Sequence, residues 1–240
     1  MTERPATSSF RAAFDRTLRL SRFAARVAHA RPALVDDLER RGAAHISRTQ
    51  MQAALEGPST ESEGPPTEKT ASRLRRLRER AMLTLAHRDL NGLASLDEVF
   101  ETMTALAEVS VASAAAHAHR SAAERFGDPR EFGGRPQPLI VAALGKLGGG
   151  ELNVSSDIDL VFLYGEDGET QGARPISHHE FFAHVGKAVI ALLSEITNEG
   201  QAFRVDMRLR PFGDSGPLAT SLGALEEYFE IGRASCRERV

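Results

Sequence analysis

Residues 145–164 read Gly-Lys-Leu-Gly-Gly-Gly-Glu-Leu-Asn-Val-Ser-Ser-Asp-Ile-Asp-Leu-Val-Phe-Leu-Tyr, so a glycine-rich turn leads through two serines into an Asp-x-Asp pair and an apolar run. The apolar run predicts a β-strand over 158–164, and alternate side chains of a strand project to the same face. Asp157 and Asp159 therefore point the same way. Two like charges this close repel each other unless a cation lies between them, and Mg²⁺ favours such oxygen ligands together with substrate phosphates. The stretch thus predicts a strand that carries a magnesium site for nucleotide chemistry.

Two further segments complete the predicted sheet. Residues 139–144 are a short continuous apolar run, as expected for a strand covered on both faces, and they lead directly into the glycine turn. Residues 202–210 alternate apolar and charged side chains, which predicts a third strand with one charged face. Asp206 lies on that face between arginines, so it supplies a third carboxylate for a two-metal phosphoryl-transfer site.

The other candidate site residues are phosphate ligands. Arg208 and Arg210 can hold phosphate oxygens with their planar guanidinium groups. Gly148 and Gly149 would let the backbone approach nucleotide phosphates without a Cβ clash. The remaining predicted ligands are Lys146, Ser155 and Ser156.

The first half of the chain has helical periodicity. Apolar residues recur at helical spacing over 10–29, over 34–38 after a proline break, and over 73–85. The basic string 73–80 in the last of these is expected to be a solvated face, with contact to an acidic partner as the less favoured alternative. Residues 57–71 are small, polar and broken by prolines, which predicts a flexible loop or linker.

Two capping boxes mark the starts of further helices. Ser95 and Glu98 open an alanine-rich helix expected to run through His119, and Ser177 and Glu180 open a helix whose apolar stripe reaches Ile196. No histidine spacing suits a shared metal ion, so these side chains are expected at surface, capping or packing positions: His117, His119, His178 and His179.

These patterns predict an α+β fold: a helical N-terminal region followed by strands with flanking helices. We expect the helical region to span residues 1–136 and an incomplete catalytic core to span 137–230. The glycine turn fits neither the Walker A loop nor the dinucleotide-binding fingerprint. The alternative for Asp157 and Asp159 is a turn or capping aspartate followed by a surface one.

Composition bounds the class of protein. The chain has 240 residues, 41% of them hydrophobic, with no apolar run near the ~20 residues of a membrane span and no secretory signal at the polar N-terminus. The single cysteine, Cys236, excludes an internal disulfide and suits the cytoplasm. A net charge of -3 argues against a general nucleic-acid binder. We therefore expect a cytoplasmic protein with neither a nucleic-acid nor a membrane partner.

The glycine turn followed by Asp-x-Asp resembles the DNA polymerase β type nucleotidyltransferase superfamily, in which two aspartates on one strand and a third on a nearby strand hold two magnesium ions. This resemblance implies that the sheet is a mixed sheet with flanking helices, like that of the superfamily. Residues 145–160 and 204–217 more closely resemble the family of bifunctional glutamine synthetase adenylyltransferase/adenylyl-removing enzymes. The string Glu-Leu-Asn-Val-Ser-Ser-Asp-Ile-Asp over 151–159 is similar to the N-terminal, adenylyl-removing half of that family.

The resemblance implies a reaction and its partners. The adenylyl-removing half takes AMP off a tyrosine of glutamine synthetase by phosphorolysis, with phosphate as the attacking group and ADP as the product. It implies that Asp157, Asp159 and Asp206 hold Mg²⁺, that adenylylated glutamine synthetase is the substrate, and that a PII-type signal protein acts through the full-length enzyme. Two alternatives remain open: forward transfer from ATP to a protein or small molecule, and a non-catalytic regulatory fragment.

The end of the chain departs from this family. Residues 231–240 resemble adapter-derived sequence, so we expect a non-native tail there. The family continues well beyond this point, and a helix expected to cover the sheet would lie in that part. Apolar surface is therefore expected to be exposed.

Overall fold

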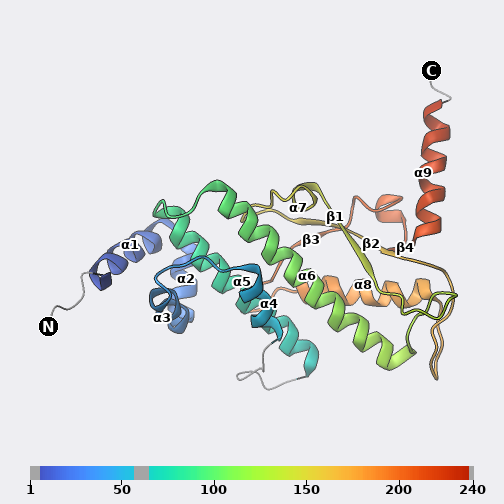
Figure 1. The fold of residues 1–240 in the computed structure, drawn as a ribbon, viewed down its shortest axis with the longest axis horizontal. Helices are drawn as coiled ribbons and strands as arrows, with labels where there is room; N and C mark the ends of the chain where they lie inside the picture. Colours follow the sequence, from blue (N-terminus) through green and yellow to red (C-terminus); the bar gives the residue numbers. More distant parts are fainter. Residues whose placement is uncertain (1–5, 57–64, 238–240) are drawn as a thin grey trace.

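The helices of the first half pack beside a small sheet and its helices in the second half (Figure 1). The computed structural model describes the backbone of residues 6–56 and 65–237, and the side chains of these except 6–8 and 231–237. The elements of the first half are α1 Ala6–Leu20, α2 Arg22–Ala30, α3 Pro32–Arg40, α4 Arg48–Glu56, α5 Pro66–Leu90 and α6 Leu96–Phe126. Those of the second half are β1 Ile140–Leu144, α7 Gly145–Gly148, β2 Ile158–Tyr164, α8 His178–Ser194, β3 Val205–Asp206, η1 Gly213–Ser215, β4 Ala219–Ser221 and α9 Leu222–Arg237. The predicted α+β fold is confirmed.

The start of the chain forms two helices where one was predicted over 10–29. Ser21 has extended backbone geometry, and its hydroxyl accepts a hydrogen bond from the Ala24 amide at 3.1 Å. The extended backbone of this N-cap residue cannot continue the preceding helix, so α1 ends at Leu20. The predicted linker over 57–71 is also partly wrong, because α5 begins at Pro66; residues 57–64 lie outside the described part of the chain.

The basic string 73–80 of α5 is buried or partly buried throughout, contrary to the predicted solvated face. Arg75 is only 7% exposed and Glu79 only 4%, and both lie among ion pairs with other elements. The acidic partner that the sequence left as an alternative is internal: it is Glu199, in the turn that follows α8.

Helix α6 belongs to the hydrophobic core that both halves share. Met103 and Leu106 of α6 lie in one buried cluster with Phe162 of β2 and Phe181 of α8. By length and composition α6 is apolar enough to cross a membrane, which contradicts the expectation that no such run exists. A core helix passes the same test, and α6 packs against α4, α5 and α8 with 56% of its most apolar window buried.

The sheet is mixed, as predicted. β2 pairs with β1 on one edge in antiparallel fashion, and on the other edge it pairs in parallel first with β3 and then with β4. Leu160, Phe162 and Tyr164 project from β2 into the shared core, where the Tyr164 ring stacks on Phe182 of α8 at 4.9 Å between centroids. Figure 1 shows α6 and α8 on the same side of the sheet. The residues that alternate with these core positions, Asp159 on β2 and Asp206 on β3, therefore lie on the other face of the sheet.

Three expectations about the second half are wrong in detail. β1 is an edge strand that stays half-exposed, with Ile140 at 40%, so it is not covered on both faces. The third strand is limited to Val205–Asp206, because the chain turns at residues 208–210 and β4 then takes the next place beside β2. Helix α8 ends at Ser194, which leaves Ile196 77% exposed.

Candidate active site

The register between β2 and β3 places the predicted carboxylates together. Ile158 is paired with Val205, and Asp159 with Asp206. Partners in neighbouring strands lie about 5 Å apart and project to the same face, so the Asp159 and Asp206 carboxylates are neighbours. The same register places Arg204 opposite Asp157, one step before the paired residues. This end of the sheet thus carries Asp159 on β2 and Asp206 on β3, with Asp157 immediately before β2.

Arginines balance two of these carboxylates. Asp157 forms an ion pair with Nε of Arg204. Asp206 accepts hydrogen bonds from Arg208, at 2.9 Å from its amide and 3.0 Å from its Nε. The side-chain hydrogen bond from Arg208, with that from its backbone amide, lowers the pKa of Asp206. Arg208 therefore lies at the carboxylates, as predicted, and Arg204 is a site residue that the sequence interpretation left out.

The donor set suits a magnesium ion in its chemistry. Carboxylate oxygens are the ligands that Mg²⁺ prefers, and the strand register brings Asp159 and Asp206 to one face, with Asp157 two residues before Asp159. Within residues 9–56 and 65–230, no three His, Cys, Asp or Glu side chains converge tightly enough to hold a metal. The assignment of these carboxylates as Mg²⁺ ligands thus rests on the backbone register and on the chemistry of the carboxylate group.

Gly145 is a second residue that the sequence interpretation missed. It begins α7 with a φ of +54°, in the left-handed region that favours glycine. A Cβ atom at this position would lie 2.4 Å from Oδ2 of Asp159. The turn therefore needs glycine here for two reasons, and one of them is the position of a candidate metal ligand.

The glycines predicted to approach phosphate have different surroundings. A Cβ on Gly148 would lie 2.5 Å from the carbonyl oxygen of Ala143, so packing of α7 against β1 already requires glycine there. A Cβ on Gly149 would make only ordinary contacts, the nearest at 3.6 Å. Lys146, between Gly145 and these glycines, is exposed on α7. Both glycines and Lys146 therefore lie in the segment that connects β1 to β2.

Asn153 organises the two serines before the Asp-x-Asp pair. Its Oδ1 accepts hydrogen bonds from the Ser156 hydroxyl at 2.7 Å and from the Ser155 amide at 3.2 Å. The pattern Asn-x-Ser-Ser is typical of an asparagine whose side chain closes its own turn, so this turn could have been predicted from the sequence. Ser155 and Ser156 thus have a local structural role immediately before Asp157.

Arg210 braces the turn after β3. Its side chain is only 12% exposed, and Nη1 donates to the Met207 carbonyl oxygen at 2.8 Å and approaches Asp214 at 3.4 Å. Of the two arginines predicted as phosphate ligands, Arg208 is the exposed one.

Among the histidines for which an expectation was given, only His178 departs from it, because it is buried. It is 1% exposed, and its ring contacts Gln137 at 2.9 Å and the carbonyl oxygens of Glu166 and Glu169 at 2.8 Å and 3.1 Å. Its hydrogen bonds fix the loop between β2 and α8, a structural role. The others fit: His179 is exposed, His117 contacts Thr70, and His119 packs on Phe181.

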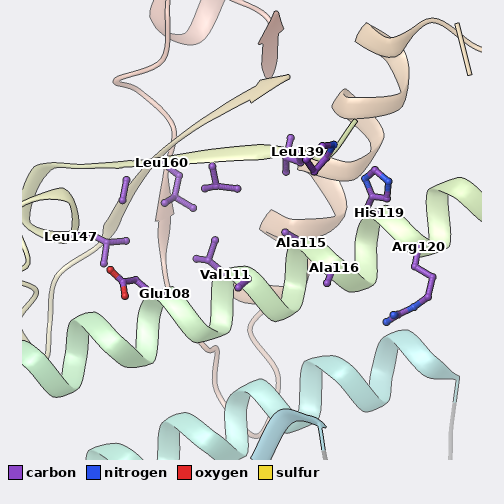
Figure 2. Close-up of a pocket in the computed structure, with 13 residues that line it drawn as sticks. Glu108, Val111, Ala115, Ala116, His119, Arg120, Leu139, Leu147 and Leu160 are labelled. Atoms are coloured by element: carbon purple, nitrogen blue, oxygen red, sulfur yellow. The ribbon is translucent and has the colours of Figure 1, made fainter. Parts of the chain in front are cut away.

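A cavity of about 610 Å³ lies between α6 and the sheet. Figure 2 shows Val111 and Ala115 of α6 on one side of this space, with Leu147 and Leu160 on the other. Its lining is mostly apolar and contains none of the predicted site residues. Leu160 faces the cavity while its neighbour Asp159 lies on the other face of β2, so the cavity and the carboxylates are separated by the strand.

A helical region followed by a mixed sheet, with a glycine turn that leads to carboxylates on adjacent strands, defines a nucleotidyltransferase-like α+β protein. The family model described as glutamate-ammonia ligase adenylyltransferase matches residues 12–234. The chain belongs to this family.

Three relatives carry the name bifunctional glutamine synthetase adenylyltransferase/adenylyl-removing enzyme. The protein of Chromobacterium violaceum is 50% identical over 225 residues, which cover 93% of this chain and 24% of the relative. That of Burkholderia mallei is 48% identical over 218 residues, 90% of this chain and 24% of the relative. That of Nitrosomonas eutropha is 55% identical over 159 residues, 65% of this chain and 17% of the relative. The chain spans at most about a quarter of the length of these relatives.

Proposed function

We propose that this chain removes AMP from adenylylated glutamine synthetase by phosphorolysis. The observation that carries the proposal is the pairing of Asp159 with Asp206 beside the glycine turn, with Asp157 at the start of the same strand. The names of the relatives support glutamine synthetase as the substrate. Each name also includes both an adenylyltransferase and an adenylyl-removing activity. The choice of the removing activity rests on the string at residues 151–159, which is similar to the N-terminal half of the family.

The reaction exchanges one phosphorus–oxygen bond for another. An oxygen of inorganic phosphate attacks the phosphorus of the AMP group, and the bond from that phosphorus to the tyrosine oxygen breaks. The tyrosine oxygen takes up a proton, and the products are ADP and an unmodified tyrosine. Such a transfer needs alignment of the reacting groups and neutralisation of their charge more than covalent help from the protein.

The carboxylates Asp157, Asp159 and Asp206 would hold Mg²⁺ in this proposal. The ion, when bound, neutralises negative charge on the phosphate groups. Arg208 is placed to bind a phosphate oxygen when its guanidinium turns from Asp206, and exposed Lys146 supplies a second cation on the turn. Gly148, Gly149, Ser155 and Ser156 stay proposed phosphate ligands. The Gly149 amide donates to the Gly145 carbonyl oxygen and both serine hydroxyls donate to Asn153, so phosphate binding would exchange these hydrogen bonds. Arg210 is assigned to support of the turn after β3.

The partners and the location are proposals of the same kind. Adenylylated glutamine synthetase, phosphate and ADP would meet the chain at this site, and control by a PII-type signal protein would act through the whole protein. A role in nitrogen assimilation in the cytoplasm follows from that substrate.

The test is an incubation of the purified chain with adenylylated glutamine synthetase and Mg²⁺, with and without phosphate, in which ADP is measured. We expect ADP only when phosphate is present, and none from Asp157→Asn. The matched control is Asp36→Asn, which makes the same chemical change at an exposed position of α3 and should keep full activity. Thermal melting of all three proteins establishes that each is folded.

Two results would contradict the proposal. Formation of pyrophosphate from ATP without any need for phosphate would indicate forward adenylylation instead. ADP release that survives Asp157→Asn would exclude the metal site as drawn.

A further inference from the structure

The turn between α8 and β3 presents a single carboxylate to the helical region. Thr197 and Gly200 exchange backbone hydrogen bonds of 3.1 Å and 2.9 Å, which closes a tight turn. The Glu199 amide donates to the Thr197 hydroxyl at 3.2 Å, so the residue is held at the tip of the turn. Glu199 is therefore fixed on the last loop before the strand that carries Asp206.

Donors from two separate parts of the helical region surround the Glu199 carboxylate. Arg31, at the junction of α2 and α3, donates from Nη2 to Oε1 at 2.6 Å. On α5, the Ser72 hydroxyl donates to Oε2 at 3.1 Å, and Nε of Arg75 lies 3.4 Å from the same oxygen. Nε of Arg76 lies 3.8 Å from Oε1. The Glu199 carboxylate thus links the α2–α3 junction and α5 to the turn after α8.

The network around this carboxylate is rich in positive charge. Arg31 also pairs with Glu79 at 2.5 Å, and Arg26 approaches Glu79 at 3.6 Å. Four arginines therefore share the two carboxylates Glu79 and Glu199 in these pairs. Burial opposes the charged form of Glu199, but hydrogen bonds from Arg31 and Ser72 outweigh it and lower the pKa of Glu199. Loss of this carboxylate would leave guanidinium groups short of a counter-charge.

The chain after Glu199 runs directly to the candidate active site. Phe203 is 3% exposed, its amide donates to the Leu193 carbonyl oxygen at 2.8 Å, and the guanidinium of Arg78 lies 5.8 Å from its ring centre. The Arg204 carbonyl oxygen then accepts from the Ile158 amide at 3.0 Å. The contacts with α5 thus hold the segment that pairs with β2.

We propose that Glu199 is a positioning residue that holds the segment 203–206 against β2 and so keeps Asp206 beside Asp159. The consequence for catalysis rests on the proposed function, whereas the consequence for the strand pairing does not. The competing explanation is an ion pair that adds only to overall stability. The two explanations differ in which amides become accessible when Glu199 is changed.

The test compares Glu199→Gln with Glu195→Gln by amide hydrogen exchange of the 240-residue chain, resolved by NMR. Both variants replace a carboxylate by an amide four residues apart, but Glu195 is exposed. Because charge-assisted hydrogen bonds hold the turn, we expect the Ile158 amide to exchange about tenfold faster in Glu199→Gln, with core amides of α6 unchanged. Glu195→Gln should match the wild type throughout.

Equal acceleration of all core amides, or no change at Ile158, would overturn the proposal. If Glu199→Gln does not fold, Ser72→Ala removes a single donor to the same carboxylate and should accelerate Ile158 about threefold, a fraction of the effect of losing the charge. Glu199→Asp keeps the charge on a shorter side chain and should recover part of the protection.

Turnover supplies a second measurement. In the ADP assay, Glu199→Gln should lower kcat about tenfold with KM for phosphate unchanged, as expected when alignment is lost and phosphate binding is not. If the wild type forms no ADP, the proposed function fails while the exchange experiment still decides the role of Glu199.

Discussion

Two of the charge clusters in the described part of the chain differ in the exposure of their arginines and in the number of partners. Around α5, Glu79 is 4% exposed, the side chains of Arg31 and Arg75 are 25% and 8% exposed, and the Glu199 carboxylate has several donors within 4 Å. At the edge of β2 and β3, Asp157 and Asp206 each pair with one arginine that is itself exposed, at 68% for Arg204 and 75% for Arg208.

The difference separates charges that hold the fold from charges that are available for chemistry. An enclosed pair loses its compensation when one partner is removed, which is costly. An exposed arginine can rotate away from its carboxylate at little cost, because water replaces the contact. Mutations in the first cluster should therefore change stability or, at Glu199, the strand pairing that this residue holds, and mutations in the second should change activity with little loss of stability.

The largest effect is expected from Asp206→Asn. Loss of one of the neighbouring carboxylates should lower ADP formation about 10³-fold, since charge neutralisation at the phosphate is a dominant contribution. The melting temperature should stay close to that of the wild type, because Arg208 is 75% exposed and water can replace its contact with Asp206. The measurement is ADP release beside a thermal melt. Asp214→Asn, on the same segment and with an exposed side chain, is the control and should keep activity. A large loss of stability in Asp206→Asn would break the distinction between the two clusters.

Glu79→Gln tests the cluster around α5, where the expected effect is on stability and not on activity. Glu79 is 4% exposed and pairs with Arg31 and Arg26, so its loss should lower the free energy of unfolding by about 3–5 kcal/mol. Urea denaturation measures this effect. Glu101→Gln, at an exposed position of α6, should change it by less than about 0.5 kcal/mol. Equal stability of the two variants would show that the enclosed pairs add nothing.

Gly145→Ala and Gly150→Ala sharpen the comparison inside the glycine turn. Both residues have positive φ, +54° and +73°, so each substitution should cost about 1–2 kcal/mol of stability. Only at position 145 would the new Cβ meet Oδ2 of Asp159, at 2.4 Å; the space at 150 is open. We therefore expect about tenfold or greater loss of ADP formation in Gly145→Ala alone. Similar activity of the two variants would mean that the contact with Asp159 has no effect on catalysis.

The smallest effect concerns pH. Burial lowers the pKa of His119, whose ring packs on Phe181, so the folded chain binds this proton less readily than the unfolded chain does. Stability is then lost as pH falls through the ordinary histidine range near ~6.5. His119→Phe removes this contribution, and its urea midpoint should fall less between pH 7.5 and 5.5 than that of the wild type. The exposed His179→Gln control should follow the wild-type profile.

Much of the fold could be predicted from local pattern. The strand over 158–164 and both serine caps depend on neighbours in the sequence, and all are present. The mixed sheet is also present, but its prediction rested on the family resemblance, because its strands pair across distant segments. The buried face of α5 could not be predicted in this way, because Arg75 meets Glu199, which is 124 residues away. The long third strand was wrong because the alternation of apolar and charged residues continues past the point where the chain leaves β2.

The candidate site was predictable in its carboxylates and less so in their support. Asp206 was expected as the third carboxylate, and the register brings it beside Asp159. Gly145 was missed because a positive φ leaves no mark in a sequence that is already rich in glycine. Asn153 had a recognisable turn pattern with the serines that follow it, and a search for side chains that close turns would have found it.

Helix α6 has a consequence for work with shorter pieces of this protein. Its 31 residues extend for roughly 46 Å, and they bury side chains against α4 and α5 on one flank and α8 on another. A cut in the connector after Phe126 would strip α6 of α8 and leave α8 without its main neighbour. The two halves are therefore expected to melt in a single cooperative transition, and expression of the sheet alone should yield an aggregating product.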